Sequence, residues 1–208
     1  MAVRRQGGEL DTAAQILDVA ERLVQSRGFN GFSYADVAAE LKITKPALHY
    51  HFASKAELGE ALIIRYADRF AAALEDLDAT APDGPAKLEG YVNLYLDVLR
   101  DKRMCLCGML AAEYQTLPVA MRDAVLGFFD HNETWLETVL QQGRSQATLH
   151  FEGTARDEAR LIVAGLEGAM LIARPFGDTA RFEVAASHMV HDVITPTSKS
   201  ANGGKARR

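Results

Sequence analysis

The segment from Ser33 to Leu58 reads SYADVAAELKITKPALHYHFASKAEL. It contains two pairs of residues with the spacing of a capping box, Ser33 with Asp36 and Ser54 with Glu57. In such a box the first side chain accepts a hydrogen bond from the backbone three residues on, and the second side chain reaches back. The two pairs therefore predict that one helix begins after Ser33 and another after Ser54.

A third helix start lies between these two. Thr44 is followed by Lys45 and Pro46. A threonine cap with proline in the first turn favours a helix, because those first N–H groups have no partner inside it. Leu48 and Phe52 then lie four residues apart, on what we expect to be the buried side. Two short helices joined by a tight turn form a helix-turn-helix, whose second helix fits the major groove of DNA.

The charges of this segment differ from those of the rest of the chain. Net charge is −5, and residues 61–194 carry 12 Lys and Arg against 20 Asp and Glu. The stretch from Leu41 to Ala56 has no acidic residue and holds Lys42, Lys45, His49, His51 and Lys55. A basic strip on an acidic body indicates contact with a polyanion, although a solvated helix face can carry the same charges.

Helical patterns continue on both sides of the strip. Thr12 with Gln15 predicts a helix start, and Gly28 predicts its end. Further helices are predicted over 87–102, 105–117, 119–146, 158–174 and 181–194, so the fold is all-α with about nine helices and no convincing strand. We expect a flexible arm over residues 1–9, a helix-turn-helix domain over 10–56, a second domain over 57–194 and a disordered basic tail over 195–208.

Composition excludes several classes of protein. Of the 208 residues 48% are apolar and 25% charged, as in an ordinary soluble domain. No apolar run is long enough to span a bilayer, and the N-terminal residues lack the apolar core of a signal peptide, so we expect a cytoplasmic protein. The motifs of common enzyme sites are absent, and neither catalysis nor a cofactor is expected. His188, His191 and Asp192 could bind a metal, but solvation explains them better, and we expect no metal site.

Residues 10–66 resemble the N-terminal DNA-binding domain of TetR-type transcriptional regulators. The resemblance is carried by Ala20, Leu23, Gly28-Phe29, Phe32 to Ala38, Leu41, Ile43 to Phe52, Ser54-Lys55 and Leu58. The chain departs from the family pattern at Lys42 and Pro46, where glycine is commoner, and at His49, where tyrosine is frequent. These departures concern the DNA sequence that is bound rather than the fold.

The resemblance and the side-chain chemistry together predict the residues that contact DNA. Lys45 can reach a phosphate or a guanine edge, whereas Tyr50 and His51 suit backbone oxygens or thymine methyls. For each residue, capping or solvation is the alternative. The predicted DNA-binding residues are Ser33, Tyr34, Thr44, Lys45, Pro46, Ala47, His49, Tyr50, His51 and Lys55, with Arg4 and Arg5 on the arm.

One recognition helix reads only a few base pairs, so a dimer on a palindromic operator is expected. The resemblance implies dimerisation through the last two helices. Small residues there, Ala164, Gly165, Gly168 and Ala169, would allow close helix approach, although packing within one chain is the alternative.

The resemblance also implies that the second domain binds a small-molecule effector, and that the protein is a repressor released from DNA by it. An apolar pocket with a few phenols suits an apolar or aromatic effector. Ordinary core packing is the alternative for each residue. The predicted ligand-binding residues are Tyr91, Tyr95, Cys105, Met109, Tyr114, Phe128, Trp135, Met170 and Phe176.

Two cysteines suggest a different kind of effector. Cys105 and Cys107 follow Lys102 and Arg103 at a predicted helix start, a setting that lowers thiol pKa and favours reaction with electrophiles or oxidants. Burial as small apolar side chains is the alternative. Two other functions remain open: a thiol-based sensor acting through these cysteines, and a helical adaptor that binds protein instead of DNA.

Overall fold

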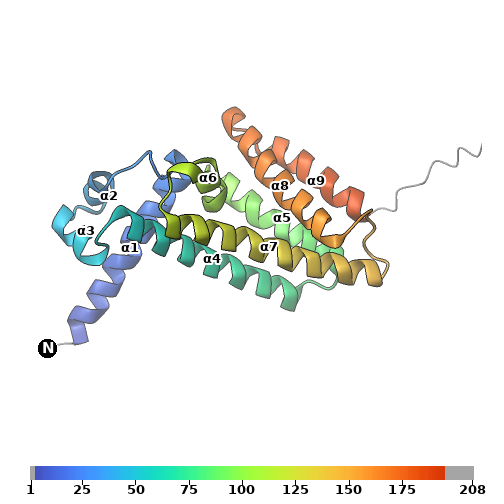
Figure 1. The fold of residues 1–208 in the computed structure, drawn as a ribbon, viewed down its shortest axis with the longest axis horizontal. Helices are drawn as coiled ribbons and strands as arrows, with labels where there is room; N and C mark the ends of the chain where they lie inside the picture. Colours follow the sequence, from blue (N-terminus) through green and yellow to red (C-terminus); the bar gives the residue numbers. More distant parts are fainter. Residues whose placement is uncertain (1–2, 195–208) are drawn as a thin grey trace, which may run out of the picture.

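The computed structural model describes residues 3–194 of the chain, and the side chains of residues 12–194. Within these residues the protein consists of α-helices and short 3-10 turns, with no strand, which confirms the all-α prediction (Figure 1). The elements are α1 (Val3–Arg27), α2 (Tyr34–Leu41), α3 (Lys45–His51), α4 (Lys55–Thr80), α5 (Gly84–Arg100), α6 (Leu106–Ala112), η1 (Tyr114–Thr116), α7 (Val119–Ser145), α8 (Ala155–Ala173), η2 (Arg174–Phe176) and α9 (Thr179–Ile194). The predicted tail over 195–208 lies outside the described residues.

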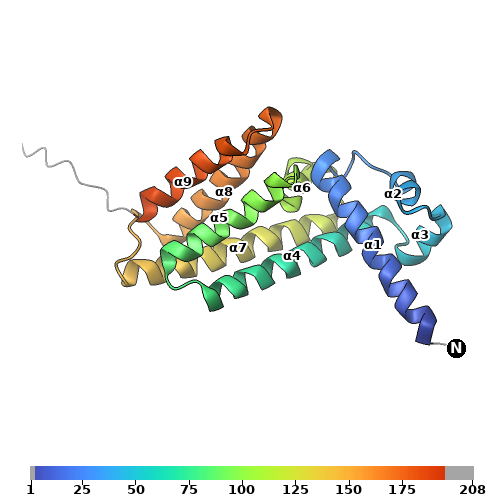
Figure 2. The same ribbon diagram turned by 180° about the vertical axis from the view of Figure 1, so that it is seen from behind.

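The helices form two groups. α2 and α3 lie with α1 at one end of the molecule, and α5, α7, α8 and α9 form a bundle toward the other (Figures 1 and 2). The short helix α6 lies between the two groups, against α1. In the bundle α7 packs on α8, α8 on α9, and α9 on α5. α4 is shared, because it contacts α1 and also packs against α5 and α7. The helix therefore runs without a break through the domain boundary predicted at residues 56–57.

The first helix begins earlier than expected. α1 starts at Val3, upstream of the Thr12–Gln15 pair, so that residues 3–9 continue the helix where a flexible arm was predicted. Helix propagation adds one hydrogen bond per residue once a nucleus exists, and this favours extension beyond an internal cap signal. The predicted end is confirmed: Gly28 follows Arg27 with a φ of +83°.

A buried carboxylate joins α1 to α4. Glu21 is 6% exposed. Its oxygens accept hydrogen bonds from Arg65 Nη2 at 3.0 Å and Arg69 Nη2 at 2.6 Å. Because one carboxylate receives two guanidinium groups, its charge is compensated inside the interface. The N-terminal domain is thus fixed to the middle of α4.

All three helix-cap signals between Ser33 and Leu58 are confirmed. Asp36 accepts from the Ser33 N–H at 2.7 Å, and Thr44 Oγ1 accepts from the Ala47 N–H at 3.2 Å. Ser54 Oγ accepts from the N–H of Glu57 at 3.1 Å. The chain thus encodes the starts of α2, α3 and α4 locally.

Removing the cap of α3 should destabilise the protein measurably. We expect Thr44→Ala to lower the free energy of unfolding by about 1 kcal/mol, because the Ala47 N–H loses its acceptor. Urea denaturation followed by circular dichroism measures this. Thr44→Ser retains the hydroxyl and should remain near the wild type; an equal loss in both variants would contradict the capping role.

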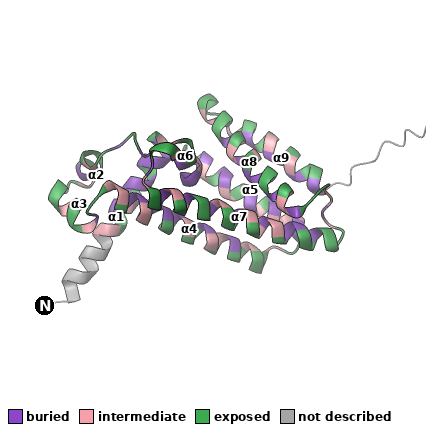
Figure 3. Ribbon diagram, in the orientation of Figure 1, coloured by how far each residue is buried: buried purple, intermediate pink, exposed green. Residues whose placement is uncertain are grey.

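The core is continuous from the helix-turn-helix into the bundle (Figure 3). Leu48 and Phe52 are buried in it, as predicted, and so are Phe29 and Phe32. No helix among the described residues is long and apolar enough to cross a membrane.

Candidate nucleic-acid interface and effector site

The exposed face of α3 carries the residues predicted to contact DNA. Leu48 is fully buried, and this orients Lys45, His49 and Tyr50 outward. Tyr50 is 73% exposed, so its ring and hydroxyl are open to a ligand. Ser33, Thr44 and Pro46 are exposed as well, whereas Ala47 and His51 are half-buried.

The turn between α2 and α3 explains one departure from the family pattern. Lys42 caps α2 with a φ of +55°, in the left-handed region where glycine is the usual residue. Its N–H donates to Ala39 O at 3.3 Å, and the N–H of Ile43 donates to Ala38 O at 3.0 Å. The tight turn therefore forms with a lysine, which adds a basic side chain beside α3.

Tyr34 holds the two short helices together. Its hydroxyl donates to Phe52 O at 3.0 Å, and its ring lies 4.7 Å from that of His49. Burial, with the nearby Glu57 carboxylate, raises the pKa of Tyr34 to about 12. The hydroxyl is therefore protonated in the physiological range and fixes α2 against the end of α3.

Lys55 is turned away from the exposed face. Its Nζ donates to Phe29 O and to Phe32 O, each at 2.5 Å, and lies over both phenylalanine rings. Burial lowers the pKa of this ammonium group. Unlike the prediction, Lys55 holds the loop before α2 and does not point toward DNA. The side chains of Arg4 and Arg5 lie outside the described residues.

A cluster of aromatic rings fills the bundle core between α4, α5 and α7. Phe70 of α4 lies 5.9 Å from Tyr95 and 5.2 Å from Phe128, and Tyr66 lies 5.6 Å from Phe128. Tyr91 donates to Asn132 Oδ1 at 3.1 Å and stacks on Trp135. The structure thus brings together Tyr91, Tyr95, Phe128 and Trp135 from the predicted set.

One acidic residue of α8 lies beside this cluster. Glu167 as a whole is half-buried, but its Oε1 is shielded from solvent and has no hydrogen-bond partner among the described residues. Burial raises the pKa of its carboxyl group to about 7, although a hydrogen bond from Cys105 opposes the shift. Burial raises the pKa of the Tyr66, Tyr91 and Tyr95 hydroxyls, and the nearby Glu167 carboxylate raises it further.

The cysteines do not have the environment predicted for them. Cys105 is the N-cap residue of α6 and Cys107 lies in its first turn, but both are buried. Burial and the nearby Glu167 carboxylate raise the pKa of both thiols well above the ordinary value. The expected lowering by Lys102 and Arg103 is wrong, because Lys102 is exposed and Arg103 pairs with Asp101 at 2.5 Å.

Two regions of the chain match known families. Residues 16–62 match the model of the bacterial regulatory proteins of the tetR family, and residues 84–189 match the tetracyclin repressor-like C-terminal domain. The chain belongs to the TetR family.

Individual relatives agree with this assignment over nearly the whole chain. The HTH-type transcriptional repressor NemR of Escherichia coli is 25% identical over 90% of this chain and 96% of its own. A TetR-family regulator from Agrobacterium tumefaciens is 32% identical, with a TM-score of 0.87 over 90% of this chain and 100% of its own. The reduced form of E. coli NemR has a TM-score of 0.76 at 26% identity, over 89% and 99% of the two chains.

The other predicted effector residues of this TetR-family protein differ in their burial and in their neighbours. Met170 is buried in α8, while Met109 is half-buried and contacts Arg174 Nη1 through its sulfur at 3.2 Å. Tyr114 lies in η1, and the guanidinium group of Arg122 lies over its ring, 5.9 Å from the ring centroid. Phe176 is 60% exposed in η2, beside Arg181. The structure therefore does not bring Met109, Tyr114 and Phe176 to the aromatic cluster.

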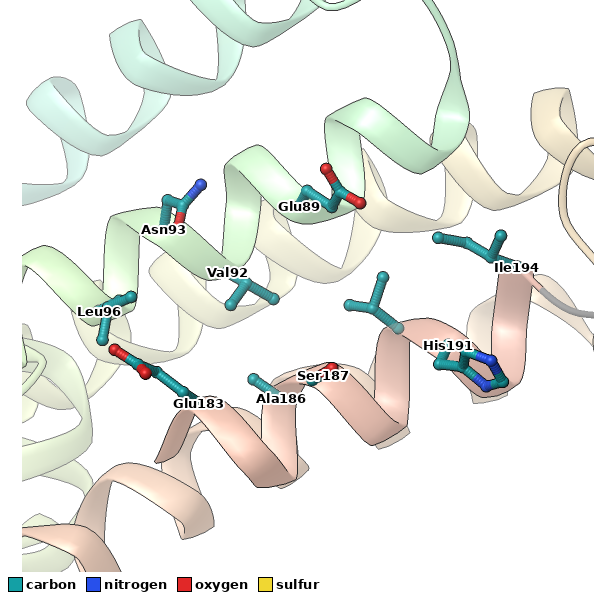
Figure 4. A pocket seen from close by; sticks show the side chains of 10 residues that line it. Glu89, Val92, Asn93, Leu96, Glu183, Ala186, Ser187, His191 and Ile194 are labelled. Carbon is teal, nitrogen blue, oxygen red and sulfur yellow. The ribbon is translucent and has the colours of Figure 1, made fainter. Parts of the chain in front are cut away.

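A groove that the sequence did not indicate lies between α5 and α9 (Figure 4). It has a volume of about 530 Å³ and contains none of the predicted ligand residues. Val92 and Leu96 of α5 face Ala186 of α9, and Glu89 and Glu183 lie along the edges. The groove is a candidate ligand cavity in the TetR-type bundle. Among the described residues, no group of His, Cys, Asp and Glu has the arrangement of a metal site.

Apolar side chains are exposed on the outer face of α8 and α9. Leu161 and Ile172 of α8 are each 61% exposed, and Val184 of α9 is 60% exposed. The small residues predicted for dimerisation differ in whether they pack within this chain. Gly165 packs against Met189 of α9 in the same chain, but Gly168 has open space around it. A shallow groove lined by Gly168, Ile172 and Val184 runs between the helices.

The sequence analysis did not identify the acidic residues that join distant elements, namely Glu21, Glu113 and Glu167. A signal existed for Glu167, since it is the single charged residue between Leu161 and Ala173. Glu113 of the segment after α6 accepts hydrogen bonds from the loop before α2. Nothing in its local pattern indicated this, because its partners lie more than eighty residues away.

Proposed function

We propose that this protein is a homodimeric transcriptional repressor that binds a palindromic operator through α3 and is released by a small-molecule effector. The observation that carries the proposal is the exposed face of α3, where Lys45 and Tyr50 project from a helix anchored by Leu48. Such a helix fits the major groove with its N-terminal residues toward the bases. Ser33, Thr44, Pro46, Ala47, His49 and His51 complete the proposed interface, with Tyr34 orienting α3 from behind.

Dimerisation through α8 and α9 is supported by their exposed apolar residues. Leu161, Gly168 and Ile172 recur on one face of α8 at helical spacing, next to Val184 of α9. An apolar patch of this kind on an outer face indicates a protein interface. Two copies joined there would present two recognition helices to one DNA duplex.

We place the effector at the aromatic cluster next to Glu167. Tyr66, Tyr95 and Phe128 offer apolar ring surface, and the Glu167 Oε1 lacks a donor. A buried acceptor without a partner is costly, so a ligand that supplies a donor gains affinity. We therefore propose an apolar or aromatic effector that carries at least one hydrogen-bond donor.

The alternatives receive less support. A thiol sensor requires a reactive thiolate, and burial disfavours the thiolate form of both Cys105 and Cys107. A helical adaptor would not require Lys45, His49 and Tyr50 to remain exposed on a short capped helix.

Lys45→Ala should weaken operator binding by about a hundredfold in the dimer, because two copies each lose one contact of more than about 1 kcal/mol. Fluorescence anisotropy on the DNA upstream of the coding region, at several salt concentrations, measures this. The salt dependence should also fall by about two counterions per dimer. Lys102→Ala, an exposed lysine of the other domain, should behave as the wild type. Equal affinities for both variants would remove α3 as the reading helix.

A further inference from the structure

The loop between α1 and α2 is held by a side chain from the far side of the domain junction. Glu113, directly after α6, accepts hydrogen bonds from the Phe29 N–H at 2.6 Å and the Asn30 N–H at 3.2 Å. Hydrogen bonds to a charged acceptor are the stronger kind. A single carboxylate of the effector domain thus fixes two consecutive amides of the DNA-binding domain.

Gly28 makes this approach possible. A Cβ at this position would lie 2.7 Å from Glu113 Oε1, and the φ of +83° disfavours other residues as well. The glycine therefore serves two purposes, ending α1 and admitting the carboxylate.

A second contact reinforces the first. Asn30 Nδ2 donates to Thr116 Oγ1 at 2.8 Å, and this hydroxyl donates to Glu113 O at 2.8 Å. The turn η1 and the α1–α2 loop are consequently joined through both main-chain and side-chain groups.

The opposite side of the same loop is bound to the start of α4. Lys55 Nζ donates to the carbonyls of Phe29 and Phe32. Phe29 therefore has its N–H bound by a carboxylate following α6, and its C=O bound by an ammonium group at the start of α4. Because only residues 52–54 separate α3 from α4, the position of Lys55 also determines where α3 ends.

The other end of α6 contacts the proposed effector region. Cys105, directly before α6, hydrogen-bonds to Glu167. The carboxylate of Glu167 occupies the space beside Gly108 where a side chain would clash. Since α6 extends only from Leu106 to Ala112, a displacement at Gly108 is transmitted to Glu113 within about one turn and a half.

We infer that Glu113 is the positioning residue that couples the effector domain to the recognition helix. The path runs from Glu167 through α6 to Glu113, then through the Phe29 peptide groups to Lys55 and α3. When a ligand displaces α6, the carboxylate leaves the loop amides and the loop no longer holds Lys55. The role of this path in DNA release rests on the proposed function. The coupling between Glu113 and the position of α3 does not depend on it.

Hydrogen exchange on the full-length protein tests the path without DNA or effector. In Glu113→Gln and Glu113→Ala, we expect exchange over residues 28–33 and 45–54 to be at least about tenfold faster than in the wild type. Peptides from α7 and α8 should keep their wild-type rates. Glu75→Gln, an exposed acid on α4, removes the same charge and should change nothing.

Two results would overturn the inference. One is faster exchange at 28–33 with unchanged exchange at 45–54, which would show that the loop is not coupled to α3. The other is a uniform increase over the whole chain, which would show general destabilisation. DNA binding by the wild type is measured separately, so that its absence would refute the proposed function while the exchange data still decide on Glu113.

Discussion

Ile172→Arg should convert the protein from a dimer into a monomer at micromolar concentration. Ile172 is 61% exposed and lines the groove between α8 and α9, which we propose as the dimer face. In a twofold dimer the substitution would place two like charges in one desolvated interface, at a cost of several kcal/mol. The dissociation constant of the dimer should rise by at least about a thousandfold.

Sedimentation velocity measures this change directly. Val119→Arg is the matched control, because Val119 is 67% exposed at the start of α7 and lies away from the α8–α9 groove. The control should sediment as the wild type, and both variants should retain their helical circular dichroism. A dimeric Ile172→Arg protein would place the interface on another surface. Loss of the dimer should also abolish tight binding to a palindrome.

Glu167→Gln should stabilise the protein at pH 8 by about 2–3 kcal/mol. In the wild type, burial raises the pKa of this carboxyl from 4.5 to about 7. The unfolded chain therefore ionises first, and the wild type loses stability as pH rises from about 4.5 to about 7. A shift of this size corresponds to about 3 kcal/mol. Glutamine has no proton to lose, so the variant should lack this decline.

Urea denaturation between pH 4 and pH 8.5 gives the required profile. The groups that face Glu167 are Cys105, Cys107, Tyr66, Tyr91 and Tyr95, whose pKa values are all raised, so they stay neutral in this range. Glu152→Gln, at an exposed loop position, should follow the wild-type profile. A Glu167→Gln profile parallel to that of the wild type would mean that the carboxyl is hydrated.

Local chemistry made the DNA-binding domain predictable. The caps at Ser33, Thr44 and Ser54 depend on residues three positions away, and each is confirmed. The outward orientation of α3 followed from Leu48 and Phe52, which lie four residues apart and are both buried, although Phe52 directly follows the helix. Nothing in these inferences required knowledge of the distant chain.

Long-range contacts explain what the sequence left undetermined. The thiol environment was predicted from Lys102 and Arg103, yet Glu167, some sixty residues later, dominates it together with burial. Lys55 shows the same limitation, because its carbonyl partners lie more than twenty residues earlier. Spacing along one helix reports which side chains share a face, but it does not identify the element that packs there.

The unbroken course of α4 constrains any attempt to recombine such regulators. A chimera joined at residue 56 would separate Glu21 from the arginines that neutralise it, since Arg65 and Arg69 would come from the other parent. A transplanted DNA-binding domain should therefore include α4 as far as Arg69. The bundle that receives it should carry a glutamate at the position of Glu113. The two domains can therefore be exchanged only together with the residues that contact each other across their junction. A chimera joined at the domain boundary alone would bury the Glu21 carboxylate without its arginine partners.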